Sequence, residues 1–325
     1  MATVSLRKIL SAIGEARSHA GRPARLCLVG DPHDVDVLVD ALLSGGAGGG
    51  ARPAGAAGDG AARSASARAA EVVGSFDVAS FARSPKELRG CSLVVFVARA
   101  GRVTPDALRA PVAMVREADV PLLAVLLDAG PGDAGTWVAS DVFFAPEVAV
   151  LRPGEALAHS DAARSIASRA DDGAVSLAAR LPALRPAVCD RIIATAARQN
   201  GVVGVLVIIP GADMPVMTVN QIRMILQIAA AYGERVGLER AVEIVSVVGL
   251  GFGLRTIARG ALEFVPGPGW MVKGGFGYTA TLALGKTAVR YFEEGAPLTT
   301  SRVRRLTEKL GKIPNPLSGR GSRTG

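Results

Sequence analysis

The sequence predicts an α/β domain with a doubly wound parallel sheet, followed by an all-α hydrophobic helical domain. In the first half, short apolar runs typical of buried strands alternate with helical segments, which indicates a parallel sheet covered on both faces. The second half has long apolar helical stretches and no strand alternation. The chain has 325 residues, which is enough for two ordinary domains.

The first half divides into an N-terminal helical segment over 1–22 and the α/β domain over 23–183. Four apolar runs predict strands: 25–30, 93–98, 121–127 and 142–144. Helical spacing of apolar residues predicts helices over 3–20, 35–43, 105–117 and 160–182. Thr104 is the expected N-cap of the third helix, because Pro105 suits the first helical position. Residues 44–70 are low-complexity Gly, Ala, Ser and Arg, and predict a flexible insertion.

The helical domain is predicted over 187–296, where two Pro-Gly pairs break the apolar stretches. Pro210-Gly211 and Pro266-Gly267 are each followed by a helical segment, ending at Tyr232-Gly233 and near 291–295. Proline fixes φ and glycine accepts a positive φ, so the pattern predicts two helical hairpins turned by Pro-Gly.

The apolar content, 49% with a mean hydropathy of +0.32, favours membrane association. The run 201–219 carries one charge, Asp213, and approaches the ~20 apolar residues of a spanning helix. Pro210-Gly211 near its middle instead favours a hairpin that dips into the bilayer, or a buried helical turn. Asp213 is either the N-cap of the next helix or an intramembrane polar site.

The net charge of +8 comes mainly from the tail, 297–325, which holds seven basic residues and one acidic residue. The tail is predicted to be disordered, and it is either a solvated end or a contact with anionic lipid headgroups. It has no aromatic side chain for base stacking, so nucleic acid is not an expected partner. The three cysteines, Cys27, Cys91 and Cys189, are odd in number and far apart, which predicts buried thiols in a reducing compartment.

Gly30 closes the first predicted strand and stands where a phosphate-binding loop, G-x-x-x-x-G-K-S/T, would begin. Val35 replaces the second glycine of that motif, Asp36 the lysine and Val37 the hydroxyl residue. A carboxylate about 4 Å from a phosphate costs on the order of 4 kcal/mol at an intermediate dielectric. The degenerate loop, with Gly30, Asp31, Val35, Asp36 and Val37, therefore predicts no bound nucleotide and no other cofactor.

The same acidic loop allows a different interpretation as a metal site, because Asp31, His33, Asp34 and Asp36 are close together. The alternative is a solvated loop in which Asp31 or Asp34 caps the following helix. The second interpretation is preferred, and neither a metal nor a catalytic residue is predicted.

The strand, glycine loop and helix, with the later strands 93–98 and 121–127, resemble the framework of small bacterial GTPases of the translation-factor type. That family's Asp-x-x-Gly is absent ahead of Leu93, and Leu127-Asp-Ala-Gly130 stands where Asn-Lys-x-Asp should follow. The resemblance therefore implies a degenerate GTPase domain.

Residues 187–296 resemble the bacterial family catalogued as domain of unknown function 697, which includes YcjF-like proteins and is often fused to GTPase domains. The residues that carry this resemblance are Pro210, Gly211, Asp213, Gln221, Arg223, Tyr232, Gly233, Pro266, Gly267 and Gly285. It implies a GTPase-associated, membrane-linked helical domain, and it brings no reaction with it.

Together these features predict a non-catalytic pseudo-GTPase that acts as an adaptor or regulator on the cytoplasmic side of the inner membrane. The expected partners are the lipid surface and a protein, either a true GTPase or a second copy of the chain. The alternatives are an active GTPase with atypical loops, a soluble cytoplasmic helical interaction protein and, most remotely, a metal-dependent hydrolase.

Overall fold

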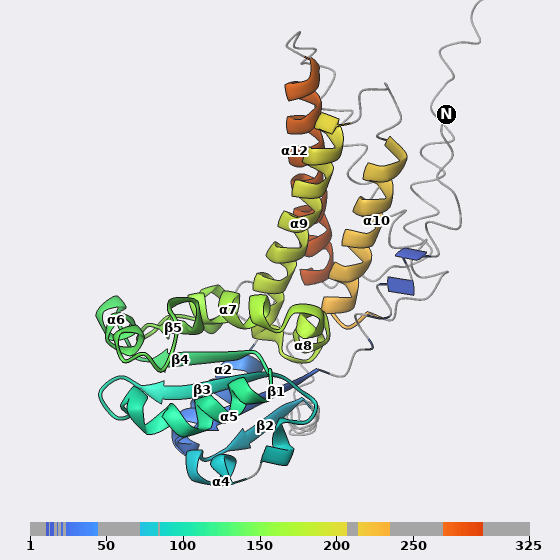
Figure 1. Cartoon of the computed structure of the whole chain (residues 1–325). Helices are drawn as coiled ribbons and strands as arrows, with labels where there is room; N and C mark the ends of the chain where they lie inside the picture. Colours follow the sequence, from blue (N-terminus) through green and yellow to red (C-terminus); the bar gives the residue numbers. More distant parts are fainter. Residues whose placement is uncertain are drawn as a thin grey trace, which may run out of the picture.

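The computed structural model describes residues 24–44, 72–83, 85–206, 214–234 and 269–294, together with six positions between Ser11 and Gly21. An α/β unit forms one part of the molecule, and a bundle of long helices extends from one face of its sheet (Figure 1). The α/β class and the helical C-terminal region predicted from the sequence are therefore confirmed.

The sheet has five parallel strands in the order β2-β1-β3-β4-β5. Their bounds are β1 Arg25–Gly30, β2 Val73–Phe76, β3 Cys91–Arg99, β4 Leu122–Leu127 and β5 Val148–Leu151. The strands predicted over 25–30 and 93–98 lie within β1 and β3, the one predicted over 121–127 matches β4 except for its first residue, and β2 was not predicted. The order 2-1-3-4-5 places the first crossover on one side of β1 and the later ones on the other, as in doubly wound folds with a switch point between β1 and β3.

The predicted strand over 142–144 is wrong. Val142 and Phe143 are buried, but they lie in a turn that follows Asp141, whose φ is +59°. Phe143 packs against Phe96 of β3 and Trp137, with ring centroids 5.9 and 5.4 Å apart. The run is apolar because it fills the core beside the sheet, whereas the edge strand forms a few residues later at β5.

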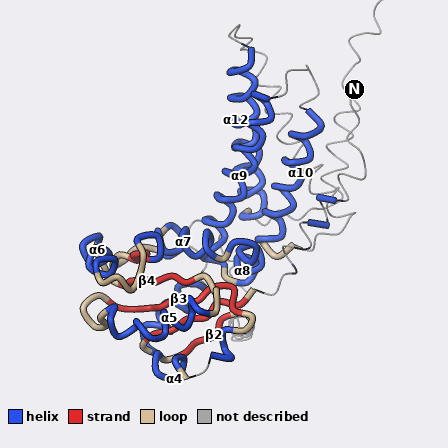
Figure 2. The backbone as a smooth tube through the Cα atoms, viewed as in Figure 1, coloured by secondary structure: helices blue, strands red, loops and turns tan. Residues whose placement is uncertain are grey.

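Helices cover both faces of the sheet (Figures 1 and 2). On one face, side chains such as Phe96 pack with α4 (Val78–Ala82), α5 (Arg109–Glu117) and α6 (Pro131–Ala139). On the other face, alternate strand residues such as Val95 pack with α2 (Pro32–Leu43), α7 (Asp161–Arg169) and α8 (Ala174–Arg180). Alternation along each strand thus produces two separate cores.

Two predicted helices differ in detail from the observed ones. Residues 105–117 form a 3-10 turn, Pro105–Leu108, that continues into α5, and the Thr104 side chain makes no capping hydrogen bond. Residues 160–182 form two helices, α7 and α8, instead of one. The break follows Ala170, where Asp171 has a φ of +39° and opens a short 3-10 turn over Asp171–Gly173.

The helical region consists of α9 (Arg185–Leu206), α10 (Met214–Ala231) and α12 (Gly269–Glu293). Gly285 of α12 faces Ile193 of α9, and Gly277 faces Asn200, so the two helices run antiparallel. Buried residues of α9, α10 and α12 belong to the same hydrophobic cluster as the adjacent face of the sheet. The boundary predicted between the α/β domain and the helical domain, near residues 183–187, therefore lies within one continuous hydrophobic core.

Cys27 of β1 and Cys91 of β3 form a disulfide, which corrects the prediction that all three cysteines are free. Their Cα atoms are 6.1 Å apart, because the two strands are neighbours in the sheet although 64 positions separate the cysteines in sequence. Cys189 in α9 is free and buried, as predicted.

Several predicted features lie outside the described residues: most of the 1–22 segment, the insertion over 44–70 apart from Ser44, and the tail over 297–325. At the six described positions between Ser11 and Gly21 the backbone is helical. No helix of the described chain is both long and apolar enough to cross a membrane.

Candidate functional site

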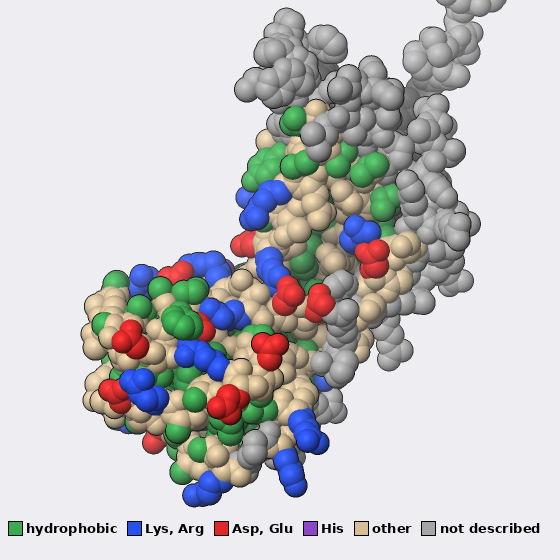
Figure 3. Space-filling view, in the orientation of Figure 1, with side chains coloured by type: hydrophobic (Ala, Val, Ile, Leu, Met, Phe, Trp, Pro, Cys, Tyr) green, Lys and Arg blue, Asp and Glu red, His purple; other side chains and the backbone are tan. Residues whose placement is uncertain are grey.

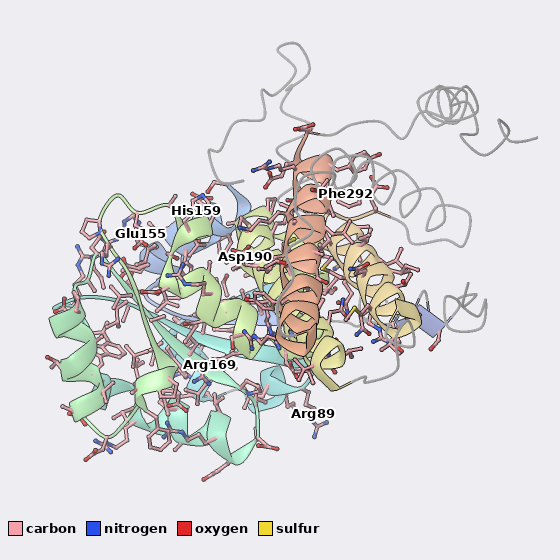
Figure 4. All side chains as sticks on the ribbon, turned by 90° about the horizontal axis from the view of Figure 1, so that it is seen from above. Arg89, Glu155, His159, Arg169, Asp190 and Phe292 are labelled. Carbon is pink, nitrogen blue, oxygen red and sulfur yellow. A yellow bond between two sulfur atoms is a disulfide. The ribbon has the colours of Figure 1, made fainter. Side chains whose placement is uncertain are left out.

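The carboxyl ends of β1 and β3 define the candidate site, because open doubly wound sheets bind ligands in the crevice outside the switch point. Gly30 ends β1 and Arg99 ends β3, and these strands are paired directly. Asp128 follows the next strand, β4, with a φ of +53°. Glu155 and His159 lie in the segment after β5 (Figure 4).

The connection from β1 to α2 is one residue long. Asp31 alone separates Gly30 from Pro32, the first residue of α2, and its side chain accepts a hydrogen bond of 3.0 Å from the backbone N–H of His33. The helix predicted over 35–43 therefore begins three residues earlier than expected, and most of the motif-aligned segment is its first turns. A phosphate-binding loop needs several consecutive backbone N–H groups free of helical bonds around the ligand, and this connection is too short to supply them.

The residues aligned with the phosphate-binding motif lie on opposite sides of α2, one side facing the sheet and the other facing solvent. Val35 is buried against the sheet and belongs to its core. Asp36 and Val37 are exposed on the opposite side of the helix. The helical repeat thus separates positions that would act together on a phosphate.

Gly30 has a structural reason to be glycine that involves no phosphate. A Cβ atom at this position would lie 2.3 Å from the backbone oxygen of Val97, far inside van der Waals contact. Because that oxygen belongs to the neighbouring strand β3, it cannot move without disturbing the sheet. The glycine that suggested a nucleotide loop is therefore required by strand packing.

Arg99, at the carboxyl end of β3, joins two carboxylates. Its Nε donates a hydrogen bond of 2.9 Å to Oδ1 of Asp34, and its Nη1 forms an ion pair with Asp128. The Asp34 side chain is completely buried, whereas 24% of the Arg99 side chain and 47% of the Asp128 side chain are exposed. The hydrogen bond to Asp34 raises the pKa of the Arg99 guanidinium, so the arginine stays charged.

This arrangement disfavours an anionic ligand. The cluster of Asp34, Arg99 and Asp128 carries a formal charge of −1, and its one cation already has two carboxylate partners. Oδ2 of Asp34 is buried without a hydrogen-bond partner, so part of the carboxylate's charge remains uncompensated. A phosphate entering here would meet negative charge and would have to displace a charge-assisted pair.

The metal-site interpretation of the acidic segment is not supported by the geometry. Asp31 caps α2, Asp34 points inward to Arg99, and His33 and Asp36 are exposed. Across the described positions, no three His, Cys, Asp or Glu side chains are grouped so that they could hold a metal ion. Of the two proposed caps, Asp31 is confirmed, and Asp34 instead forms the buried ion pair.

In the helical region, the described motif residues make contacts between helices. Gln221 of α10 donates a hydrogen bond of 3.3 Å to the hydroxyl of Thr281 on α12. Arg223 pairs with Glu15 of the N-terminal segment at 2.5 Å. Gly285 allows close approach, because a Cβ there would lie 2.6 Å from Cγ1 of Ile193.

The Tyr232-Gly233 pair ends α10, as predicted. Gly233 has a φ of +82°, and the Glu234 N–H donates back to the Ala229 carbonyl at 3.0 Å, which closes the helix. The Tyr232 ring stacks on Phe292, which lies near the end of α12 and is labelled in Figure 4. Pro210, Gly211, Asp213, Pro266 and Gly267 lie outside the described residues.

Sequence reasoning missed Arg99 and Asp128. The available signal was a charged residue ending an otherwise apolar strand, Cys91–Arg99, and an aspartate directly after the next strand. In a parallel sheet, neighbouring strand ends meet at one edge, so opposite charges there predict a pair.

The chain matches no known family model, and no curated protein matches it either. The two resemblances read from the sequence therefore remain proposals.

Proposed function

We propose that this protein is a non-catalytic adaptor or regulator whose α/β domain has the layout of a GTPase without its nucleotide chemistry. The observation that carries the proposal is the Arg99–Asp34 pair, which lies at the carboxyl end of β3, beside the switch point where doubly wound folds bind nucleotides. The one-residue connection between β1 and α2 removes the loop that would surround phosphates.

The α/β domain then serves as a protein-binding surface, and the helical domain holds it at the cytoplasmic side of the inner membrane. The membrane part is supported by the apolar run at 201–219 and by the basic tail over 297–325. Its resemblance to the YcjF-like helical family agrees with a partner that is a true GTPase or a second copy of the chain.

A soluble helical interaction protein is the second candidate. It is favoured by the continuous hydrophobic cluster that α9, α10 and α12 share with the sheet, because these helices bury much of their apolar surface against one another. Cell fractionation separates the two candidates. A membrane protein remains in the pellet until detergent is added, whereas the second candidate is released by buffer alone.

Equilibrium titration of the full chain with fluorescent GTP and ATP in the presence of Mg²⁺ tests the loss of nucleotide chemistry. We expect no saturable binding at millimolar nucleotide. Saturation in the micromolar range would restore the active-GTPase alternative and overturn the proposal.

A further inference from the structure

The outer edge of the sheet at β5 lies in a groove between two helices. β5 is the last strand of the described sheet and pairs with β4 on its inner side. α6 packs on one face of the sheet and α7 on the other, so β5 lies between them at the margin of the α/β unit (Figure 1). The groove has a volume of 420 Å³ and is lined, within the described chain, by β5, Arg152, α6 and α7. Because none of these lining residues belongs to β4, the groove follows the outer side of β5.

Part of the β5 backbone faces this groove. The carbonyl oxygen of Leu151 accepts a hydrogen bond of 3.4 Å from the N–H of Ala129, so Leu151 is turned toward the β4 side. Since successive residues of a strand bond to alternate sides, Val148 and Val150 are turned outward. The Val148 N–H donates to the Ala145 carbonyl. The Val148 carbonyl and both backbone groups of Val150 therefore remain for a further strand.

The two walls of the groove differ in polarity. The α6 wall is apolar and consists of Pro131 and Ala134. The opposite wall is polar, with two basic side chains, one acidic side chain and two hydroxyl groups: Arg152, Asp161, Arg164, Ser165 and Ser168. Arg152 and Arg164 are 56 and 60% exposed, and their pairs with nearby carboxylates lie at the surface, where such pairs are weak. In Figure 3, apolar side chains lie beside charged ones over this part of the α/β unit.

We infer that the groove binds an extended peptide segment of a partner protein, which adds to the sheet beside β5. The peptide backbone pairs with the outward groups of Val148 and Val150. Successive side chains of a strand point to opposite faces, so alternate residues of the peptide meet α6 and α7. The α6 wall selects apolar residues, and the basic excess of the α7 wall selects acidic ones. This inference rests on the proposed adaptor function and names its protein-binding surface.

The recessed position of β5 favours a single strand over a second copy of the chain. Ala149, in the middle of β5, is 3% exposed, and Val148 and Val150 are half-buried. A symmetric dimer through β5 would bring two such edges together, and the helices beside each edge would meet before the strands could pair. A lone extended segment carries no such helices, and the groove volume is within the range of about 300–1,000 Å³ that is usual for ligand sites.

Fluorescence anisotropy of the full chain with the labelled peptide Val-Glu-Val-Glu-Val tests the inference. We expect saturable binding, with the peptide Val-Lys-Val-Lys-Val bound about fivefold more weakly because its charges oppose those of the α7 wall. Ser168→Trp places an indole ring in the groove and should weaken binding by more than about tenfold. The matched control is Ala139→Trp, at the end of α6 and outside the groove lining, which should bind like the wild type. Both positions are exposed, so circular dichroism should be unchanged in both variants.

Two modified peptides test the backbone pairing directly. One carries N-methyl groups on its valines, and the other carries them on its glutamates. In an added strand only one of these two sets of N–H groups faces β5. We therefore expect one modified peptide to lose binding by more than about tenfold and the other to keep it.

Failure of the wild type to bind Val-Glu-Val-Glu-Val, or equal binding by Ser168→Trp, overturns the groove inference but leaves an adaptor that uses another surface. Equal effects of the two N-methylated peptides overturn strand addition. If the wild type instead forms a dimer that Ser168→Trp dissociates, the edge binds a second copy of the chain and the peptide inference is wrong. None of these outcomes bears on the nucleotide titration, which tests the loss of nucleotide chemistry separately.

Discussion

The Nε atom of Arg99, at the end of β3, lies 2.9 Å from Oδ1 of Asp34, in the first turn of α2. Because Asp34 is completely buried, this contact compensates a carboxylate that water cannot reach. The pair fixes the start of α2 against the end of β3.

Removal of the arginine should therefore destabilise the domain. Arg99→Met leaves the buried Asp34 without its partner, and the midpoint of thermal unfolding should fall by several degrees. Arg99→Met/Asp34→Leu removes both charges and should recover most of that loss. Circular dichroism melts measure the effect, and Arg109→Met is the control, since its pair with Asp106 is exposed on both sides. Equal melting of Arg99→Met and Arg109→Met would contradict the assigned role.

Replacing Gly285 by alanine, the smallest side chain, should lower the stability of the protein. In Gly285→Ala the new Cβ would overlap with Ile193, so the free energy of unfolding should fall by about 1–3 kcal/mol, as in other overpacked cores. Gly135→Ala in α6 is the matched control, because no atom lies within 4 Å of its Cβ position. That control should be neutral or gain up to about 1 kcal/mol from helix propensity. Chemical denaturation gives both values, and an unaffected Gly285→Ala would disprove the close contact of α9 with α12.

Thiol counting tests the disulfide between β1 and β3. The protein purified without reductant and then unfolded should present one reactive thiol, that of Cys189. After reduction it should present three. A count of three before reduction would show that Cys27 and Cys91 are free, as the sequence alone suggested.

Alkaline pH should destabilise the fold. Burial raises the pKa of the Cys189 thiol from its ordinary 9.0 to about 12, and burial also raises the pKa of the Tyr232 hydroxyl. Both groups keep their protons longer in the folded state, so their contribution to stability is complete below pH about 9 and declines as the pH rises toward about 12. Urea unfolding across this range should show the decline, and Cys189→Ala should make it shallower. A flat profile would mean that these side chains are not buried as described.

Local patterns were sufficient to predict the sheet class, because the apolar runs at β1, β3 and β4 are long enough to be buried on both faces. They failed for β5, because Val142 and Phe143 are as apolar as a strand while filling a turn beside Trp137. β2 is four residues long and contains a glycine, so it lacks a clear pattern.

The candidate site was predicted only in part. Sequence reasoning singled out Gly30 at the end of the first strand, and its prediction that no nucleotide binds there stays a prediction. It placed the start of the following helix at residue 35, three residues late, because comparison with a motif fixes spacing but not where a helix begins. Arg99 and Asp128 meet Asp34 only after strands distant in sequence are placed side by side, and the Cys27–Cys91 bond depends on the same long-range pairing.

The most direct test of the proposed loss of nucleotide binding is a crystal structure of the full chain grown with GTP and Mg²⁺. We predict that Arg99 Nε will remain within hydrogen-bonding distance of Asp34 and that no triphosphate will lie beside residues 30–37. Electron density for the nucleotide at this edge, with Arg99 turned away from Asp34 toward the phosphates, would contradict the account.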